Sequence, residues 1–122
     1  MKFLIIDDHV VIRTGIKVLL TEKFGALEIH EAFNGKSARE QLQNNVYNLV
    51  IMDIQMPDTD ALALMEFIKS EYPAAKVLMY SMSAGKIYAK RFIRCGAMGF
   101  LSKDAPLEEI TRAIDMVLNN KK

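Results

Sequence analysis

Five short apolar runs alternate along this chain with five longer amphipathic stretches, and that alternation constrains the fold more than any other feature of the sequence. The runs predict strands at residues 2–6, 27–33, 48–52, 76–81 and 99–102. The first, third and fourth runs are almost continuously apolar, which is typical of strands that helices cover on both faces. The sequence therefore predicts a parallel sheet between two layers of helices.

The stretches between the runs carry apolar residues at helical spacing. They predict helices at residues 12–24, 36–43, 59–71, 84–95 and 106–117. Gly25, Pro73 and Gly96 follow three of these stretches as stop signals, and Pro106 stands near the first turn of the last. Five βα units with right-handed crossovers predict an α/β fold, a doubly wound (βα)5 flavodoxin-like sandwich whose five-stranded parallel sheet has the order 2-1-3-4-5.

Length and composition limit the number of domains and the kinds of partner that these residues can bind. A length of 122 residues suffices for one domain with a single sound core. The net charge is +1 and the longest basic cluster is Lys121-Lys122, so nothing predicts contact with nucleic acid or an anionic membrane. No apolar run approaches the roughly 18 residues of a membrane span. Because the lone Cys95 has no disulfide partner, we expect a cytoplasmic protein.

Chemically reactive side chains stand at the predicted carboxyl ends of the strands. Asp7 and Asp8 follow the first strand, Asp53 follows the third, Ser81 ends the fourth and Lys103 follows the fifth. Ligands of doubly wound sheets bind at this edge, so we expect these groups to face one crevice. Three converging carboxylates repel one another unless a cation lies among them. Their oxygen donors favour Mg²⁺ over Zn²⁺.

The neighbours of the carboxylates indicate the chemistry of the crevice. Lys103 offers a mobile positive charge and Ser81 a hydroxyl group to phosphoryl oxygens. His9 follows the acidic pair, but a single imidazole at a helix start is more typical of a solvated or capping side chain than of a metal ligand. The set therefore predicts a phosphoryl site in which one carboxylate acts as the nucleophile.

These residues fall within motifs whose combination resembles the receiver domain of two-component response regulators. The motifs are Asp7-Asp8 after the first strand, Met52-Asp53-Ile54-Gln55-Met56-Pro57 around the end of the third, Ser81 at the end of the fourth and Phe100-Leu101-Ser102-Lys103 in the fifth. Each motif alone is weak, but their order on a (βα)5 pattern is hard to produce by accident. Residues 1–118 are identified as a receiver domain by this resemblance.

The resemblance implies that Asp53 is the phosphoacceptor, which takes a phosphoryl group from the phosphohistidine of a sensor histidine kinase. Asp8, Asp53 and the backbone carbonyl of Gln55 would hold Mg²⁺, and Asp7 would act directly or through water. Gln55 and Ser83 flank the route of an attacking water and would tune the loss of the phosphoryl group.

The resemblance also implies a conformational switch. Lys103 would pair with the phosphoryl group, and Ser81 would swing toward it and vacate space for Phe100. This movement would remodel the face made by the fourth helix, the fifth strand and the fifth helix. The weak apolar pattern of the fourth helix is typical of a movable element, because a bistable element needs a gap of only a few kcal/mol.

Two positions depart from the family pattern. Ala61 stands where the family usually has Gly, so the start of the third helix must tolerate a Cβ. Lys103 is followed by Asp104 rather than by the common Pro, and this leaves the geometry of the peptide bond after Lys103 open, because cis bonds are costly outside Xaa-Pro.

The segment from Lys103 to Ile110 resembles the NarL/FixJ class, whose members usually carry a LuxR-type helix-turn-helix output domain after a linker. Residues 119–122 are then the start of a linker, and DNA binding belongs to a C-terminal domain outside this chain. A free-standing single-domain receiver is the alternative. A homodimer formed on phosphorylation would use helices four and five, or helices one and five.

Three further interpretations compete with the receiver. Asp7, Asp8 and Asp60 also suit helix caps, and for Asp60 capping is favoured. A phosphohydrolase of the haloacid-dehalogenase type also uses a strand-end Asp, but its motif has Asp where Gln55 stands. A pseudo-receiver that acts as a constitutive interaction module is disfavoured by the complete set of family residues.

Overall fold

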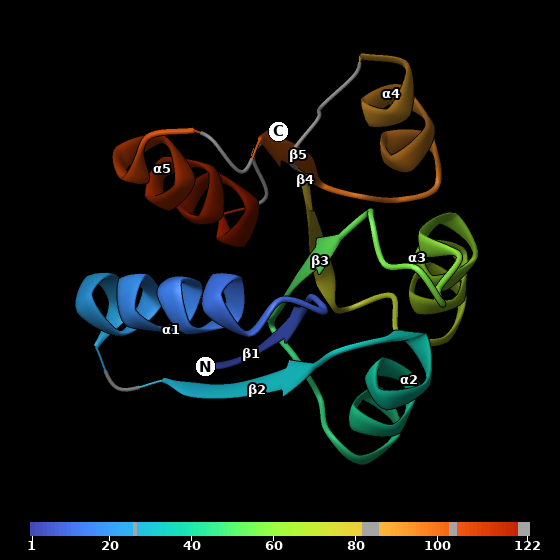
Figure 1. The fold of residues 1–122 in the computed structure, drawn as a ribbon, viewed down its shortest axis with the longest axis horizontal. Helices are drawn as coiled ribbons and strands as arrows, with labels where there is room; N and C mark the ends of the chain where they lie inside the picture. Colours follow the sequence, from blue (N-terminus) through green and yellow to red (C-terminus); the bar gives the residue numbers. More distant parts are fainter. Residues whose placement is uncertain (26, 82–85, 103–104, 120–122) are drawn as a thin grey trace.

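The computed structural model describes residues 1–25, 27–81, 86–102 and 105–119, in which strands and helices alternate strictly (Figure 1). The strands are β1 (Lys2–Ile6), β2 (Glu28–Ala32), β3 (Leu49–Asp53), β4 (Lys76–Ser81) and β5 (Gly99–Ser102). The helices are α1 (Val10–Phe24), α2 (Gly35–Asn44), α3 (Ala61–Glu71), α4 (Lys86–Arg94) and α5 (Leu107–Leu118). The predicted alternation of five βα units is confirmed.

All five strands are parallel and pair in the order β2-β1-β3-β4-β5, which confirms the doubly wound, flavodoxin-like α/β fold. From β1 the chain first adds β2 on one side and then β3 on the other, so the direction of winding reverses between β1 and β3. Ile6 stands opposite Met52 in this central pair. The residues that follow these two positions therefore meet at the switch point of the sheet, where ligands of such folds bind.

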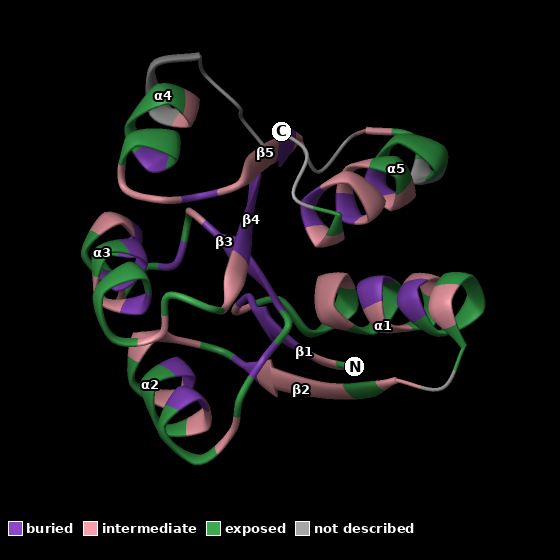
Figure 2. Ribbon diagram, turned by 180° about the vertical axis from the view of Figure 1, so that it is seen from behind, coloured by how far each residue is buried: buried purple, intermediate pink, exposed green. Residues whose placement is uncertain are grey.

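Helices α1 and α5 cover one face of the sheet, and α2, α3 and α4 cover the other (Figure 1). Alternate residues of β1 supply two cores, because Phe3 and Ile5 face the α1/α5 layer while Leu4 and Ile6 face the opposite layer. All four are 0% exposed. Figure 2 shows buried residues concentrated on the central strands and on parts of the helices, whereas the edge strand β2 is mostly of intermediate burial. Burial on both faces explains the almost continuous apolar runs from which the central strands were predicted.

Capping groups decide where α2 and α3 begin. Asn34 Oδ1 accepts a hydrogen bond from the N–H of Ser37 at 2.8 Å, and Ser37 Oγ accepts one from the N–H of Asn34 at 3.1 Å, which forms a capping box. Asp60 Oδ1 accepts a hydrogen bond from the N–H of Ala63 at 3.1 Å. Because Asp60 is the cap, α3 begins at Ala61 rather than at the predicted residue 59. The capping interpretation of Asp60 is confirmed.

Other boundaries differ from the prediction by one or two residues. The ladder between β1 and β2 ends at Ala32, so β2 is shorter than the predicted 27–33. The strand β3 includes Asp53, which pairs with Tyr80 of β4, whereas the prediction ended at residue 52. Ala61 is 5% exposed in the first turn of α3, so the fold accommodates its Cβ. Residues 84 and 85 of the predicted fourth helix lie outside the described residues. Among the described helices, none is both long and apolar enough to cross a bilayer.

Two glycines are expected to respond in opposite directions to alanine. Gly15 lies exposed in the middle of α1, where a Cβ has nothing within 4 Å. Gly15→Ala is therefore expected to raise the free energy of unfolding by about 0.5–1 kcal/mol. Gly96 has φ of 111°, and a Cβ there lies 2.7 Å from Lys69 Cδ. Gly96→Ala is expected to lower the free energy of unfolding by about 1–3 kcal/mol.

Urea denaturation of the two glycine variants and the parent chain measures both effects. Shifts of the same sign for Gly15→Ala and Gly96→Ala would contradict this account of the two positions.

Candidate functional site

Three carboxylates and one imidazole gather where β1 and β3 end. One ligand atom from each of Asp7, Asp8, His9 and Asp53 lies within 4.8 Å of the others. Asp7 and Asp53 are each 1% exposed, Asp8 is partly buried and His9 is exposed. The structure therefore brings together the three carboxylates that the strand order predicted to converge. We call these four residues the acidic cluster.

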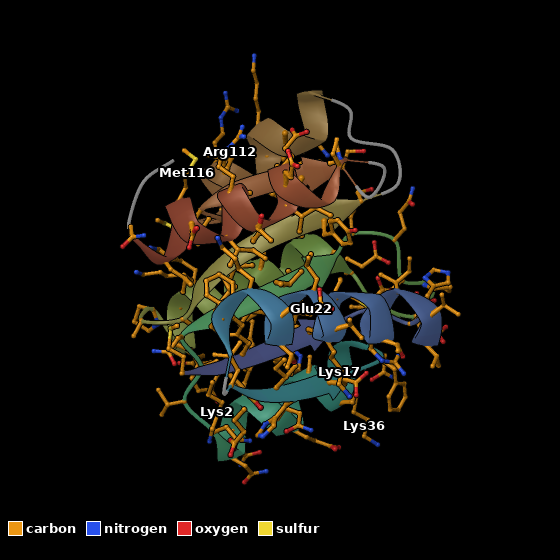
Figure 3. All side chains as sticks on the ribbon, turned by 90° about the vertical axis from the view of Figure 1, so that its left-hand side faces the viewer. Lys2, Lys17, Glu22, Lys36, Arg112 and Met116 are labelled. Atoms are coloured by element: carbon orange, nitrogen blue, oxygen red, sulfur yellow. The ribbon has the colours of Figure 1, made fainter. Side chains whose placement is uncertain are left out.

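Asp7 is held in place by the sheet and by α1. Its N–H donates to Ala32 O at 3.0 Å, and its backbone oxygen accepts a hydrogen bond from Arg13 Nη1 at 2.6 Å. Arg13 Nε donates to Glu31 Oε1 at 3.0 Å, and Lys17 Nζ donates to Glu31 Oε2 at 3.1 Å. Figure 3 looks onto α1 and α5 and shows Lys17 on the side of α1 nearer to β2. Helix α1 is thus tied to the edge strand directly beside the acidic cluster.

Glu31 stays ionised over the neutral range, so its pairing with Arg13 and Lys17 does not depend on pH there. Partial burial alone raises the pKa of Glu31, but hydrogen bonds and attraction from Lys17 and Arg13 outweigh it and hold the pKa below the ordinary value. The stability contributed by this pairing is present above about pH 4.3, the pKa of an unfolded Glu, and is lost as the pH falls through the lower folded pKa.

Asp53 ends β3 and its side chain organises the turn that follows. Its Oδ1 accepts a hydrogen bond from the N–H of Gln55 at 3.1 Å. The N–H of Thr59 donates to Met56 O at 3.1 Å, and the side chain of Met56 is 5% exposed in the core beneath α2 and α3. Gln55 itself is exposed. The turn therefore keeps the backbone of Gln55 beside the carboxylate of Asp53.

His9 is the residue whose position the sequence did not predict. It is the N-cap of α1, but its side chain makes no capping hydrogen bond. Its Nδ1 instead lies 2.9 Å from Asp7 Oδ1 and 3.0 Å from Asp8 Oδ1. Its backbone N–H donates to Asp7 Oδ1 at 2.9 Å, so the Asp7 carboxylate supports the loop between β1 and α1. The one available signal was the place of His9 directly after an acidic pair at the switch point.

The donors of the acidic cluster fit a hard divalent cation. Most of them are carboxylate oxygens, the ligands that Mg²⁺ and similar ions prefer. Asp8 Oδ1 is inaccessible to solvent and, although His9 Nδ1 lies 3.0 Å away, it accepts no well-aligned hydrogen bond from the described residues. A buried carboxylate oxygen without such a bond is costly, and a bound cation would offset that cost. The acidic cluster is therefore consistent with a metal site.

Ser81 and Phe100 lie on the same face of the sheet. Ser81 is 1% exposed at the end of β4 and stands opposite Ser102, while Phe100 stands opposite Met79. Because alternate residues of a strand share a face, the hydroxyl and the aromatic ring lie on neighbouring strands, two residues apart along them. Phe100 is half-buried, and its ring centroid lies 6.5 Å from that of Phe92 in α4. An aromatic side chain thus connects the neighbourhood of Ser81 with α4.

Some predicted positions lie outside the described residues. They are Lys103, the peptide bond between Lys103 and Asp104, Ser83, and residues 120–122 of the predicted linker. Their roles stay predictions.

The chain matches known proteins over almost its whole length. A family model described as the response regulator receiver domain matches residues 3–115. The Fimbriae Z protein of Salmonella typhimurium is 35% identical over 116 residues, which cover 95% of this chain and 55% of that protein. The virulence-factor transcription regulator BvgA of Bordetella pertussis is 34% identical over 117 residues, which cover 96% and 56%. The chain thus spans about half the length of the curated relatives it matches.

A solved structure supports the same assignment. The signal receiver domain of NarL from Mycobacterium tuberculosis matches with a TM-score of 0.87 and 25% sequence identity, and the match covers 97% of this chain and 95% of that one. The predicted resemblance to receivers of the NarL class is confirmed. The fold, the carboxylates at its switch point and the match over residues 3–115 agree, and the chain belongs to the response regulator receiver domain family, whose members are signalling domains of two-component systems rather than enzymes.

Proposed function

We propose that this chain is a phosphorylation switch that accepts a phosphoryl group from a sensor histidine kinase onto Asp53. The observation that carries the proposal is the position of Asp53, which is 1% exposed at the carboxyl end of β3 with the carboxylates of Asp7 and Asp8 beside it. At such short range, each carboxylate raises the free energy needed to keep its neighbours ionised. Such a cluster does not stabilise the fold, but it can bind a cation that in turn binds a phosphoryl group.

In the proposed reaction, an oxygen of the Asp53 carboxylate attacks the phosphorus atom of the phosphohistidine. A P–O bond forms while the P–N bond breaks, and the electron pair of that bond leaves with the imidazole of the kinase. A carboxylate nucleophile has no proton to lose, so no general base is needed. The main task of the site is to position the groups and to balance their charge.

Mg²⁺ is the cation proposed for the acidic cluster. Asp8, Asp53 and the backbone carbonyl of Gln55 would hold it, and Asp7 would bind it directly or through water. When bound, the ion neutralises charge on the transferring phosphoryl group. Lys103 is proposed to pair with a phosphoryl oxygen as a second positive charge.

Ser81 and Phe100 are proposed to carry the signal from the phosphoryl group to the surface. The group adds about −1.5 to −2 charge and three acceptor oxygens, which favours the state in which the Ser81 hydroxyl donates to it. Phe100 would then occupy the space beside Ser81 and change its contact with Phe92, which remodels the face of α4, β5 and α5. The half-buried position of Phe100 supports this role, because a fully packed ring has no room for a second position.

The output is proposed to be control of transcription through a C-terminal helix-turn-helix domain, with residues 119–122 as the start of the linker. The support is that BvgA is named as a transcription regulator and that this chain covers 56% of it. Homodimerisation on phosphorylation, a cytoplasmic location and tuning of the phosphoryl lifetime by Gln55 and Ser83 belong to the same proposal. The second candidate is a free-standing receiver that acts through a protein partner.

Phosphorylation by acetyl phosphate tests the proposed reaction without a kinase. With Mg²⁺ present, we expect intact-mass spectrometry to show one added phosphoryl group per chain. Removal of Mg²⁺ with EDTA is expected to slow the labelling at least about a hundredfold, because the acidic cluster then repels the donor. Restored labelling after excess Mg²⁺ is the control. Labelling at an unchanged rate in EDTA would contradict the proposed role of the metal.

A further inference from the structure

We propose that His9 is a direct metal ligand of the acidic cluster through Nδ1, and that it makes the site bind Mn²⁺ more tightly than Mg²⁺. This inference rests on the proposed divalent-metal site and adds a nitrogen donor to its oxygen donors. The observation behind it is that the His9 imidazole is directed toward the carboxylates of Asp7 and Asp8.

The conformation of His9 is the first argument. An N-cap side chain usually accepts a hydrogen bond from the first turn of its helix. His9 makes no such bond, although it is the N-cap of α1. Its side chain is 59% exposed, so burial does not force the imidazole toward the carboxylates of Asp7 and Asp8. The ring nevertheless places Nδ1 beside both carboxylates. Their two negative charges attract a cation, and Nδ1 lies where it can bind that cation.

The spacing of the atoms is the second argument. An octahedral cation with bonds of about 2.1 Å has neighbouring ligand atoms about 3.0 Å apart. His9 Nδ1 lies 2.9 Å from Asp7 Oδ1 and 3.0 Å from Asp8 Oδ1. These separations equal the edge length of such an octahedron. They are also hydrogen-bond distances, so the cation would take the place of the hydrogen atom between His9 Nδ1 and Asp7 Oδ1.

The chemistry of the donor decides which cation benefits. Carboxylate, carbonyl and water oxygens suit Mg²⁺, whereas imidazole suits transition metals and adds little for Mg²⁺. Mn²⁺ accepts the same oxygen ligands and has a higher affinity than Mg²⁺ for nitrogen. With His9 as a ligand, Mn²⁺ is the preferred ion of the site at equal concentration.

Electron spin echo envelope modulation of bound Mn²⁺ tests the ligand directly. The chain has two histidines, so labelling the histidine rings with ¹⁵N marks only His9 and His30. We expect a ¹⁵N coupling of the strength of a bound imidazole in the unmutated chain. The coupling is expected to vanish in His9→Ala and to persist in His30→Gln, the matched control in which the other histidine, in β2, is changed.

Calorimetric titration of the same proteins supplies the second measurement. His9→Ala is expected to weaken Mn²⁺ binding about tenfold or more and Mg²⁺ binding less than about threefold. Mn²⁺ that binds without an imidazole coupling in the unmutated chain would overturn the role of His9 and leave the proposed metal site intact. Failure of both ions to bind the unmutated chain would overturn the proposed metal site itself, and the role of His9 with it.

Discussion

Asp53→Asn is expected to abolish the labelling of this chain by acetyl phosphate in the presence of Mg²⁺. The amide of Asn is not a nucleophile toward phosphorus, and it removes one of the oxygen ligands proposed for the metal. We therefore expect the rate of labelling to fall at least about 10³-fold, as is typical when the group that forms the covalent bond is lost. Intact-mass spectrometry at several times after addition of the donor measures this rate.

The matched control is Asp60→Asn. Asp60 is exposed and accepts the hydrogen bond that caps α3, and Asn is as good a cap as Asp. This variant is expected to be labelled at the parent rate. Asp53→Asn is also expected to fold, because it removes one of three carboxylates that repel one another. Full labelling of folded Asp53→Asn would exclude Asp53 as the phosphoacceptor.

Phe3→Ala is expected to lower the free energy of unfolding by about 3–5 kcal/mol, the typical cost of removing a fully buried aromatic side chain. Phe3 is 0% exposed in β1, and its ring meets that of Phe24 edge to face with centroids 6.0 Å apart. The cavity would open between the sheet and α1, where Ile5 and Leu20 are also 0% exposed. Because β1 also leads into Asp7 and Asp8, we expect the loss of metal binding to accompany unfolding of the variant.

Phe33→Ala is the matched control for Phe3→Ala. Phe33 is 59% exposed after β2, and the same substitution there is expected to change the free energy of unfolding by less than about 0.5 kcal/mol. Urea denaturation without added metal measures both variants in the same way. A loss at Phe3 as small as the one expected at Phe33 would show that the packing against α1 contributes little to stability.

The strands and the edge that carries the site were predictable because both follow from local pattern and topology. The runs around Ile5 and Val50 are almost continuously apolar, since both faces of the sheet are covered. Once the strands are parallel and the crossovers right-handed, Asp7, Asp8 and Asp53 must follow adjacent strands. Their convergence was therefore predictable, and the structure supplied the distance, with one ligand atom of each within 4.8 Å of the others.

The ends of elements were less predictable, because single hydrogen bonds decide them. Asp53 continues the apolar strand although it is charged, since it still pairs with Tyr80 in the ladder with β4. Thr59 lies outside α3 because the side chain of Asp60 accepts the hydrogen bond from Ala63. Neither the strand pairing of Asp53 nor the cap at Asp60 can be predicted from the spacing of hydrophobic residues.

The sequence by itself determined the fold class and the three carboxylates of the site, because hydrophobic period and crossover handedness leave few arrangements of a chain this short. Only the tertiary structure decided the direction of the His9 side chain and the contact between Phe100 and Phe92. Both depend on where neighbouring elements lie in space. The loop after β1 places the oxygens of Asp7 and Asp8 on the same side as the imidazole, which lies within 3.0 Å of both. This distance cannot be predicted from the spacing of the residues in the sequence.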